Sequence, residues 1–210
     1  MINMVKLPTK KSDLFLRVAK GHFATSHSHI NYYIDVTLTK FRLSEARAAA
    51  QELVRGYRGT TIIDTILCLD GTEVIGACMG SELTKAGYSN MNAHQTIYVV
   101  TPEHTTGSQL LFRENTAPMI AGKHVLVLAA SVTTGFTVQG AVEAIRYYGG
   151  EPAGVTAIFA TVDKCAGYPV ASIFDPHDLP DYQSYDAHSC PWCKEGKKID
   201  ALVNSFGYSS

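Results

Sequence analysis

The sequence Val-Leu-Val-Leu-Ala-Ala-Ser-Val-Thr-Thr-Gly-Phe-Thr, residues 125–137, decides the fold. It joins an apolar run typical of a buried strand to a loop of small hydroxyl residues, and residues 137–148 predict a helix after it. Free amides at the start of that helix, its dipole and the hydroxyls can all face one phosphate. The alternative is that the loop only caps the helix. The predicted phosphate-binding residues are Ser131, Thr133, Thr134, Gly135 and Thr137.

Strand and helix patterns alternate before and after this segment. Residues 61–69 predict a strand that leads through Asp70-Gly71 to a helix at residues 73–86, and residues 153–160 predict a further strand. An earlier helix, capped by Ser44, has one apolar face. Such alternation predicts an α/β fold with a central, mainly parallel sheet flanked by helices, which binds ligands at the carboxyl ends of its strands.

The remaining segments have weaker patterns. We expect a short helix at residues 12–20, capped by Ser12, then a loop and a strand. Residues 96–101 predict a strand, and residues 109–113 predict part of a hairpin or a mobile flap.

The C-terminal part differs in composition from the rest. After Phe174 the chain is rich in Pro, Asp and His, with a helix pattern at residues 197–206. We therefore expect residues 1–174 to form the domain and residues 175–210 to form an appendage.

Composition excludes several classes of protein. Of the 210 residues, 46% are hydrophobic and 18% charged, as is ordinary for a globular protein. The net charge of −1 provides no cationic field for nucleic acid. The longest apolar run, about eight residues, falls far short of the roughly 20 that span a membrane, and the N-terminal lysines precede no secretory signal. We expect a cytoplasmic protein that binds neither nucleic acid nor membranes.

Two segments together resemble the type I phosphoribosyltransferases, and the orotate enzymes most of all. Residues 125–137 look like the family's phosphoribosyl-diphosphate motif. The stretch Gly-His-Phe-Ala-Thr-Ser-His-Ser-His-Ile-Asn-Tyr-Tyr-Ile-Asp, residues 21–35, is similar to the segment that borders the base in the orotate enzymes. The resemblance covers roughly residues 12–162.

The resemblance implies a fold and an activity. The fold is that of the type I phosphoribosyltransferases, with residues 1–40 as a hood-like segment. The activity is transfer of the phosphoribosyl group from phosphoribosyl diphosphate to the nucleobase orotate or a related base, in pyrimidine nucleotide synthesis. Mg²⁺ would serve as cofactor, and the chain would form a homodimer.

The resemblance also assigns roles to residues outside the phosphate loop. The diphosphate and Mg²⁺ would meet Asp70, Gly71, Thr72 and Glu73, and the base would meet His27, Tyr32 and Tyr33. His104 and Arg113 would stand in for the Lys and His of the family's catalytic loop. The alternatives are structural: Asp70 shapes a turn, Glu73 favours a helix start, and one of the two tyrosines faces the core if the strand alternates.

The chain departs from the family at one important place. The two adjacent acids that hydrogen-bond the ribose hydroxyls in the family fall here on Ala129 and Ala130. The reaction passes through a cationic ribose, so losing two anions weakens its stabilisation. Two functions therefore stay open: phosphoribosyl transfer, or binding of a nucleotide or phosphoribosyl diphosphate without catalysis.

The sequence His188-Ser-Cys190-Pro-Trp-Cys193 belongs to neither motif. Its Cys-x-x-Cys spacing allows two thiolates to bind one zinc, with His188 as a third ligand and His177, His27 or His29 as a fourth. The alternatives are a redox pair and two ordinary thiols. Structural zinc with a vestigial ligand pocket is a third possible function.

Overall fold

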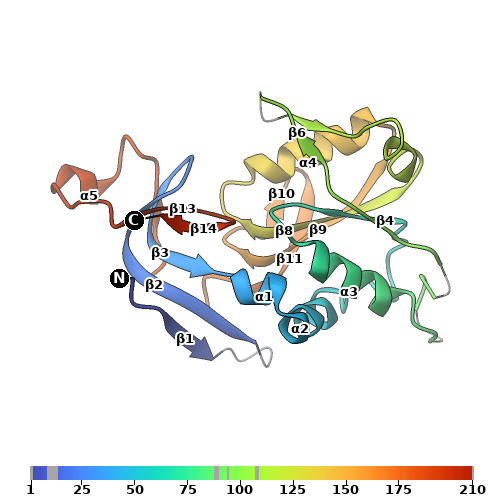
Figure 1. Ribbon diagram of the computed structural model, residues 1–210, viewed down its shortest axis with the longest axis horizontal. Helices are drawn as coiled ribbons and strands as arrows, with labels where there is room; N and C mark the ends of the chain where they lie inside the picture. The colour runs from blue at the N-terminus through green and yellow to red at the C-terminus, as the bar shows by residue number, and fades with distance from the viewer. Residues whose placement is uncertain (1, 9–13, 88–89, 94, 107–108, 210) are drawn as a thin grey trace.

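The computed structural model describes residues 2–8, 14–87, 90–93, 95–106 and 109–209. Its centre is a six-stranded sheet in the order β10-β11-β9-β8-β4-β5 (Figure 1). β10 runs antiparallel to β11, and all other neighbours in this sheet are parallel. The predicted α/β fold with a mainly parallel sheet is confirmed. The strands are β4 (Thr65–Cys68), β5 (Tyr98–Val100), β8 (His124–Val132), β9 (Glu151–Ala160), β10 (Lys164–Cys165) and β11 (Tyr168–Phe174).

Helices cover both faces of this sheet because β8 is apolar on both sides. Val125 and Val127 pack in one buried cluster with α4 (Phe136–Tyr147). Leu126 and Leu128 pack in another with α2 (Leu43–Leu53) and α3 (Glu73–Leu83). Successive strand residues point to opposite faces, so one continuous apolar run supplies both cores.

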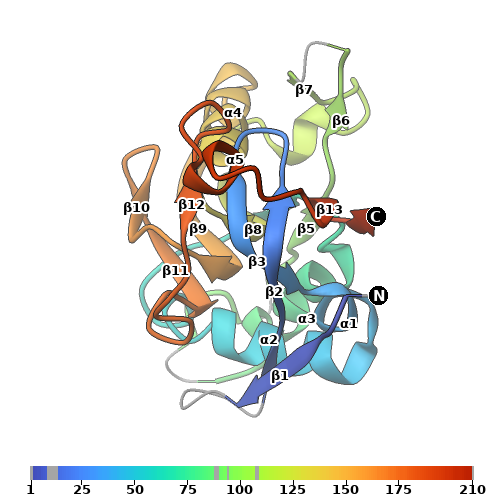
Figure 2. The same cartoon turned by 90° about the vertical axis from the view of Figure 1, so that its left-hand side faces the viewer.

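A second sheet combines the two ends of the chain. It has the order β12-β3-β2-β13-β14, with β1 paired to β2, and Figures 1 and 2 show its blue N-terminal strands beside the red C-terminal ones. Residues 175–210, for which the sequence predicts an appendage, thus supply three of its strands. The strands are β1 (Val5–Pro8), β2 (Phe15–Ala24), β3 (His29–Asp35), β12 (Ser184–Tyr185), β13 (Ala201–Asn204) and β14 (Gly207–Ser209).

Two predicted helices are strands in the structure. The prediction for residues 12–20 is wrong, because β2 starts at Phe15; its predicted cap, Ser12, lies outside the described residues. β2 is buried on both faces, with Leu16 in the central core and Ala19 in the core of the second sheet. The prediction for residues 197–206 is also wrong, because β13 pairs with β2 there.

Several boundaries shift while the element type holds. α2 begins at Leu43, one residue before the predicted cap, and α3 ends at Leu83 rather than at residue 86. β6 (Glu103–His104) and β7 (Leu110–Leu111) pair antiparallel, which confirms the predicted hairpin. Three short helices complete the described elements: α1 (Thr37–Phe41), η1 (Ala117–Met119) and α5 (Pro191–Lys194).

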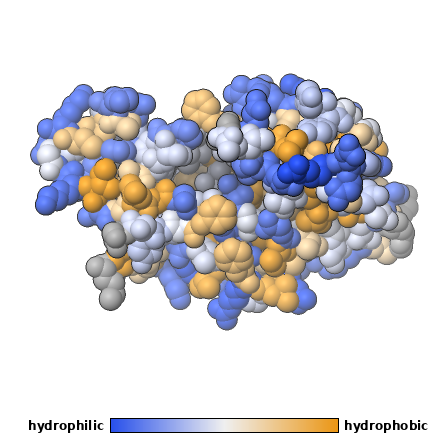
Figure 3. Space-filling view, turned by 45° about the horizontal axis from the view of Figure 1, so that its top comes forward, coloured by the Kyte–Doolittle hydropathy of each residue, from blue (hydrophilic) through white to orange (hydrophobic). Residues whose placement is uncertain are grey.

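The exterior mixes polar and apolar groups. Hydrophilic and apolar side chains are interspersed over the face shown in Figure 3. Within the described ranges, every helix is too short or too polar to cross a membrane.

Candidate functional site

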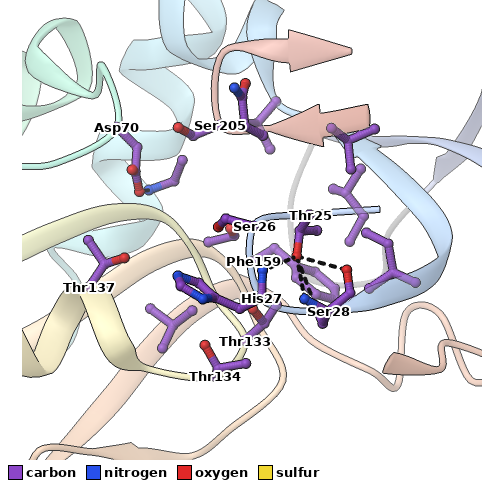
Figure 4. Close-up of a pocket in the computed structure, with 18 of the residues that line it drawn as sticks. Thr25, Ser26, His27, Ser28, Asp70, Thr133, Thr134, Thr137, Phe159 and Ser205 are labelled. Atoms are coloured by element: carbon purple, nitrogen blue, oxygen red, sulfur yellow. Dashed lines mark hydrogen bonds between the residues drawn. The ribbon is translucent and has the colours of Figure 1, made fainter. Parts of the chain in front are cut away.

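A cavity of about 230 Å³ lies where the two sheets meet. Three of the segments that line it are the turn between β2 and β3, the end of β8 with the loop to α4, and the turn between β13 and β14 (Figure 4). The first and third belong to the second sheet, while the middle one belongs to the central sheet. The cavity therefore forms only when both ends of the chain are folded against the central domain.

The five residues predicted to bind phosphate all line this cavity. Their loop is held from behind, because Thr161 donates from its amide to the Val132 carbonyl (2.9 Å) and from its hydroxyl to the Thr133 carbonyl (3.2 Å). Gly135 caps α4 with φ of +80°, a conformation that favours glycine. The first amides of α4 have no intrahelical acceptor, so the loop combines amide donors with the hydroxyls of Thr134 and Thr137. Phosphate binding by these residues stays a prediction.

Asp70 is the acidic residue of the cavity wall. It follows β4 with φ of +59°, and its Oδ2 accepts the Ala130 amide at 3.4 Å. Burial raises the pKa of this carboxyl, against the opposing effects of the Ala130 amide and the Lys40 charge. Asp70 therefore brings one carboxylate from the turn after β4 to the end of β8, beside Ala130.

Lys40 supports Asp70 from outside the cavity. This lysine is fully buried, and its ammonium group donates to the carbonyls of Asp70 (2.7 Å) and Ser205 (2.5 Å). Burial lowers the pKa of Lys40, opposed by the charge of Asp70. Lys40 thus joins the turn after β4 to the turn between β13 and β14, which both line the cavity. Sequence reasoning missed this residue, because a single lysine in a five-residue helix gives no signal.

The other predicted diphosphate residues do not reach the cavity. Thr72 is buried and donates its hydroxyl to the Leu69 carbonyl at 2.8 Å. Glu73 accepts the Thr101 hydroxyl at 3.0 Å, at the start of α3. Gly71 follows Asp70 in the turn, with φ of +75°. Of the four, the structure gives a place in the described cavity wall to Asp70 alone.

The three residues predicted to meet the base lie in two different places. His27 and Tyr33 line the cavity, with the His27 ring 5.6 Å from that of Phe136. Burial raises the pKa of Tyr33 to about 12, so its hydroxyl is neutral. Tyr32 packs instead in the central core and donates its hydroxyl to Asp181 Oδ2 at 2.8 Å. The alternation of β3 explains why only one of the two tyrosines reaches the cavity.

The two predicted catalytic-loop residues lie at the β6–β7 hairpin, away from the described cavity wall. The Arg113 guanidinium forms an exposed ion pair with Glu103, with Nη2 to Oε2 at 2.7 Å. His104 is exposed as well, and its charge is among the influences that oppose the burial-driven rise of the Asp70 pKa. Neither residue is among the described residues that line the cavity, and a catalytic role for them stays a prediction.

The Cys-x-x-Cys pair lies at a second cluster. Cys190 and Cys193 meet His22 and His29, and the ligand atoms of all four lie within 4.8 Å of one another. His188, predicted as a ligand, is exposed, and its amide donates to Asp186. His188 is therefore not part of this group, and its role as a ligand stays a prediction, while His29 is among the predicted candidates for the fourth ligand. Sequence reasoning missed His22, because a single histidine in a strand pattern gives no metal signal.

Comparison with known proteins shows the family of this chain. The chain is 36% identical over 180 residues to the orotate phosphoribosyltransferase of Caldanaerobacter subterraneus subsp. tengcongensis, covering 85% of this chain and 86% of that protein. It belongs to the orotate phosphoribosyltransferase group of the type I phosphoribosyltransferase family. The corresponding protein of Pelotomaculum thermopropionicum is 27% identical over 178 residues, covering 84% of this chain and 85% of the relative. No protein-family model matches the chain.

The fold of this chain is similar to that of a solved orotate phosphoribosyltransferase. The orotate phosphoribosyltransferase of Aeropyrum pernix matches with a TM-score of 0.57 at 17% identity, covering 78% of this chain and 90% of that one. At such an identity the match shows the fold alone. In the structure, the predicted phosphate loop follows the central strand β8, and Ala129 and Ala130 lie near the end of that strand.

Proposed function

We propose that the protein is an orotate-type phosphoribosyltransferase, which transfers the phosphoribosyl group of phosphoribosyl diphosphate to orotate or a related base. The observation that carries this proposal is the cavity wall, which the five predicted phosphate-binding residues share with Asp70; Figure 4 labels Asp70, Thr133, Thr134 and Thr137 there. The 5-phosphate would bind at the loop before α4, where amides and hydroxyls converge. The ribose would then extend toward Asp70.

The position of Asp70 supports phosphoribosyl transfer by this chain despite the alanines at positions 129 and 130. A developing positive charge on the ribose needs a nearby anion, and the family's acids are alanines here. Asp70 Oδ2 lies 3.4 Å from the Ala130 amide, so a carboxylate from the neighbouring strand lies beside the vacated position. His27 and Tyr33, on the β2–β3 side, would border the base.

Mg²⁺ is implied by the family, and one carboxylate fits it. Mg²⁺ in such sites is usually held by one or two carboxylates together with substrate phosphates. Asp70 provides one in the described cavity wall. Burial raises the pKa of this carboxyl because it disfavours the charged form, and a nearby cation would offset that effect by stabilising the carboxylate. Asp70 would hold the ion with the diphosphate, and bound Mg²⁺ would neutralise charge on the leaving diphosphate.

Binding without catalysis is the second candidate, and a specific observation favours it. The described residues of the cavity wall include no lysine or arginine, and the hairpin guanidinium of Arg113 is paired with Glu103. A diphosphate group therefore lacks a fixed cationic partner there. A ribonucleotide 5′-monophosphate has a single phosphate, which would bind at the loop, so it needs no cationic partner for a diphosphate group.

A calorimetric titration separates the two candidates. The protein is titrated with phosphoribosyl diphosphate and Mg²⁺, then with orotate, while release of diphosphate is assayed in the same sample. Binding followed by diphosphate release supports the transferase, and binding without release supports the second candidate. The variant Thr134→Phe, which fills the phosphate end, should abolish binding, whereas Thr84→Phe outside the cavity should not. Absence of binding to phosphoribosyl diphosphate and to orotidine 5′-monophosphate would refute both.

A further inference from the structure

A cluster of two histidines and two cysteines lies outside the cavity, where the tail crosses the β2–β3 hairpin. His22 is on β2 and His29 begins β3, while Cys190 and Cys193 flank the start of α5. The contacting histidines and cysteines are 164 to 171 positions apart in the sequence, yet Cys193 Sγ lies 3.2 Å from His29 Nδ1. Both cysteines are free thiols rather than a disulfide.

The spacing of the four ligand atoms matches a tetrahedral zinc site. With Zn–N of about 2.05 Å and Zn–S of about 2.3 Å, a tetrahedron requires about 3.3 Å between nitrogens and about 3.6 Å between nitrogen and sulfur. The two histidine nitrogens are 3.1 Å apart. His22 Nε2 lies 3.6 Å from Cys190 Sγ and 3.7 Å from Cys193 Sγ. Cys193 Sγ lies 3.2 Å from His29 Nδ1, and all four ligand atoms lie within 4.8 Å of one another, so the cluster is compact enough to hold one zinc ion.

The tautomer of His22 is also fixed for metal binding. Its Nδ1 lies 3.0 Å from the Lys197 carbonyl and 3.2 Å from the Lys198 carbonyl. Carbonyl oxygens only accept, so Nδ1 carries the proton, and Nε2 directs its lone pair at the cysteines. Donation from the second ring nitrogen to a backbone carbonyl is a usual feature of histidine ligands.

The surroundings shelter the cluster and hold it in place. The Trp192 ring lies 5.4 Å from the His22 ring and 5.1 Å from the Tyr185 ring. Asp200 accepts the His22 amide at 2.7 Å with its carboxylate, and its own amide donates to the His22 carbonyl at 2.7 Å. The histidine is therefore positioned on both sides by the tail that carries the cysteines.

We propose that His22, His29, Cys190 and Cys193 bind a structural zinc ion that fastens the C-terminal tail to the β2–β3 hairpin. Four protein ligands complete the tetrahedron and leave no position for a substrate, which is the arrangement of structural rather than catalytic zinc. On binding zinc, the two thiols lose their protons, and all four side chains exchange their contacts with one another for bonds to the metal.

The site reaches the cavity through the chain on both sides. Residues 25–28 lie between the two histidines and line the cavity, and the tail continues from the cysteines to Asn204 and Ser205, which line it too. Zinc thus fixes two of the segments that form the cavity wall. This consequence rests on the cavity itself and holds whichever ligand the cavity binds.

Metal content tests the proposal directly. Full-length protein purified without metal-affinity steps should contain one zinc per chain by plasma mass spectrometry, and Cys193→Ser should lose it. Cys193 is exposed, so its replacement leaves the packing intact. Cys78→Ser, at a partly exposed free cysteine on α3, is the matched control and should keep one zinc. Equal zinc in Cys193→Ser and in the native protein would overturn the assignment.

Cobalt substitution gives a measurement on the native sequence. Co²⁺ bound by two thiolates and two imidazoles should produce thiolate charge-transfer absorption and strong visible bands of tetrahedral cobalt. A chelator should then lower the melting temperature of the native protein and of Cys78→Ser. A protein that takes up neither Zn²⁺ nor Co²⁺, or that forms a Cys190–Cys193 disulfide in air in the presence of zinc, would refute the proposal. Zinc content is measured without substrate, so failure to bind phosphoribosyl diphosphate would leave the zinc result unaffected.

Discussion

Replacing Gly135 by alanine should destabilise the protein for two separable reasons. Gly135 caps α4 with φ of +80°, which costs a residue with a side chain about 1 kcal/mol or more. A Cβ atom at this position would also lie 2.6 Å from Cys165 Sγ, which is too close for any real contact. Overpacking typically costs about 1–3 kcal/mol, and we expect the low end of this range because Sγ is the end of a partly exposed side chain that can rotate away.

The two contributions together give a loss of about 2 kcal/mol in the free energy of unfolding. For a domain of this size each kcal/mol shifts the melting temperature by about 2–4 °C, so a fall of roughly 4–8 °C is expected. Urea denaturation of the native protein and of Gly135→Ala measures the loss.

The second variant, Cys165→Ala, separates the clash from the backbone strain. It removes Sγ but keeps a Cβ at 3.8 Å from the Cβ that alanine would add at position 135, which is ordinary contact. The double variant should therefore recover the overpacking part and retain about 1 kcal/mol of strain. If Gly135→Ala is as stable as the native protein, or if Cys165→Ala recovers nothing, the reasoning about this loop is wrong.

Three further substitutions test the site and the core. Asp70→Asn should raise the free energy of unfolding at pH 7 and reduce turnover. Burial raises the pKa of Asp70, so the stability that its carboxyl contributes is present below pH 3.8 and is lost as the pH rises through the raised pKa. Urea titrations should show the gain at pH 7 and almost none at about pH 3.5. Thr137→Val should weaken phosphate binding about 10-fold or more by calorimetry, with an unchanged unfolding midpoint. Tyr57→Phe removes a buried hydrogen bond of 3.1 Å to the Val155 carbonyl and should cost about 1 kcal/mol in urea denaturation.

The central sheet and the phosphate loop were predictable because their signals are local. Residues 125–137 contain a two-sided apolar strand, a loop of small residues and a helix start within one short segment. Each neighbouring strand-turn-helix unit repeats the same pattern, so parallel pairing follows from chain order. The carboxyl ends of these strands then indicate the binding edge, where Asp70 and Thr134 both line the cavity.

The second sheet was less predictable because its burial comes from distant parts of the chain. Leu14, Phe15 and Val18 fit a helical spacing as well as a strand, and only pairing with β3 and β13 decides between them. Lys40 shows the same limit. Its role depends on two carbonyls, of Asp70 and Ser205, that no spacing in the sequence connects to it.

The tail is the clearest case, since its position depends more on side chains than on backbone pairing. β12 and β13 each meet the N-terminal strands through only two register pairs, Ser184–Ile30 and Tyr185–His29, and Ala201–Phe23 and Leu202–Ala24. Ladders so short are weak by themselves. The tail is held in addition by Asp200 on the backbone of His22 and by the Cys-His cluster. Strand propensity therefore cannot reveal its place, whereas the Cys-x-x-Cys spacing revealed half of the cluster that holds it, because the cysteine pair is the one part of this attachment that is local in sequence.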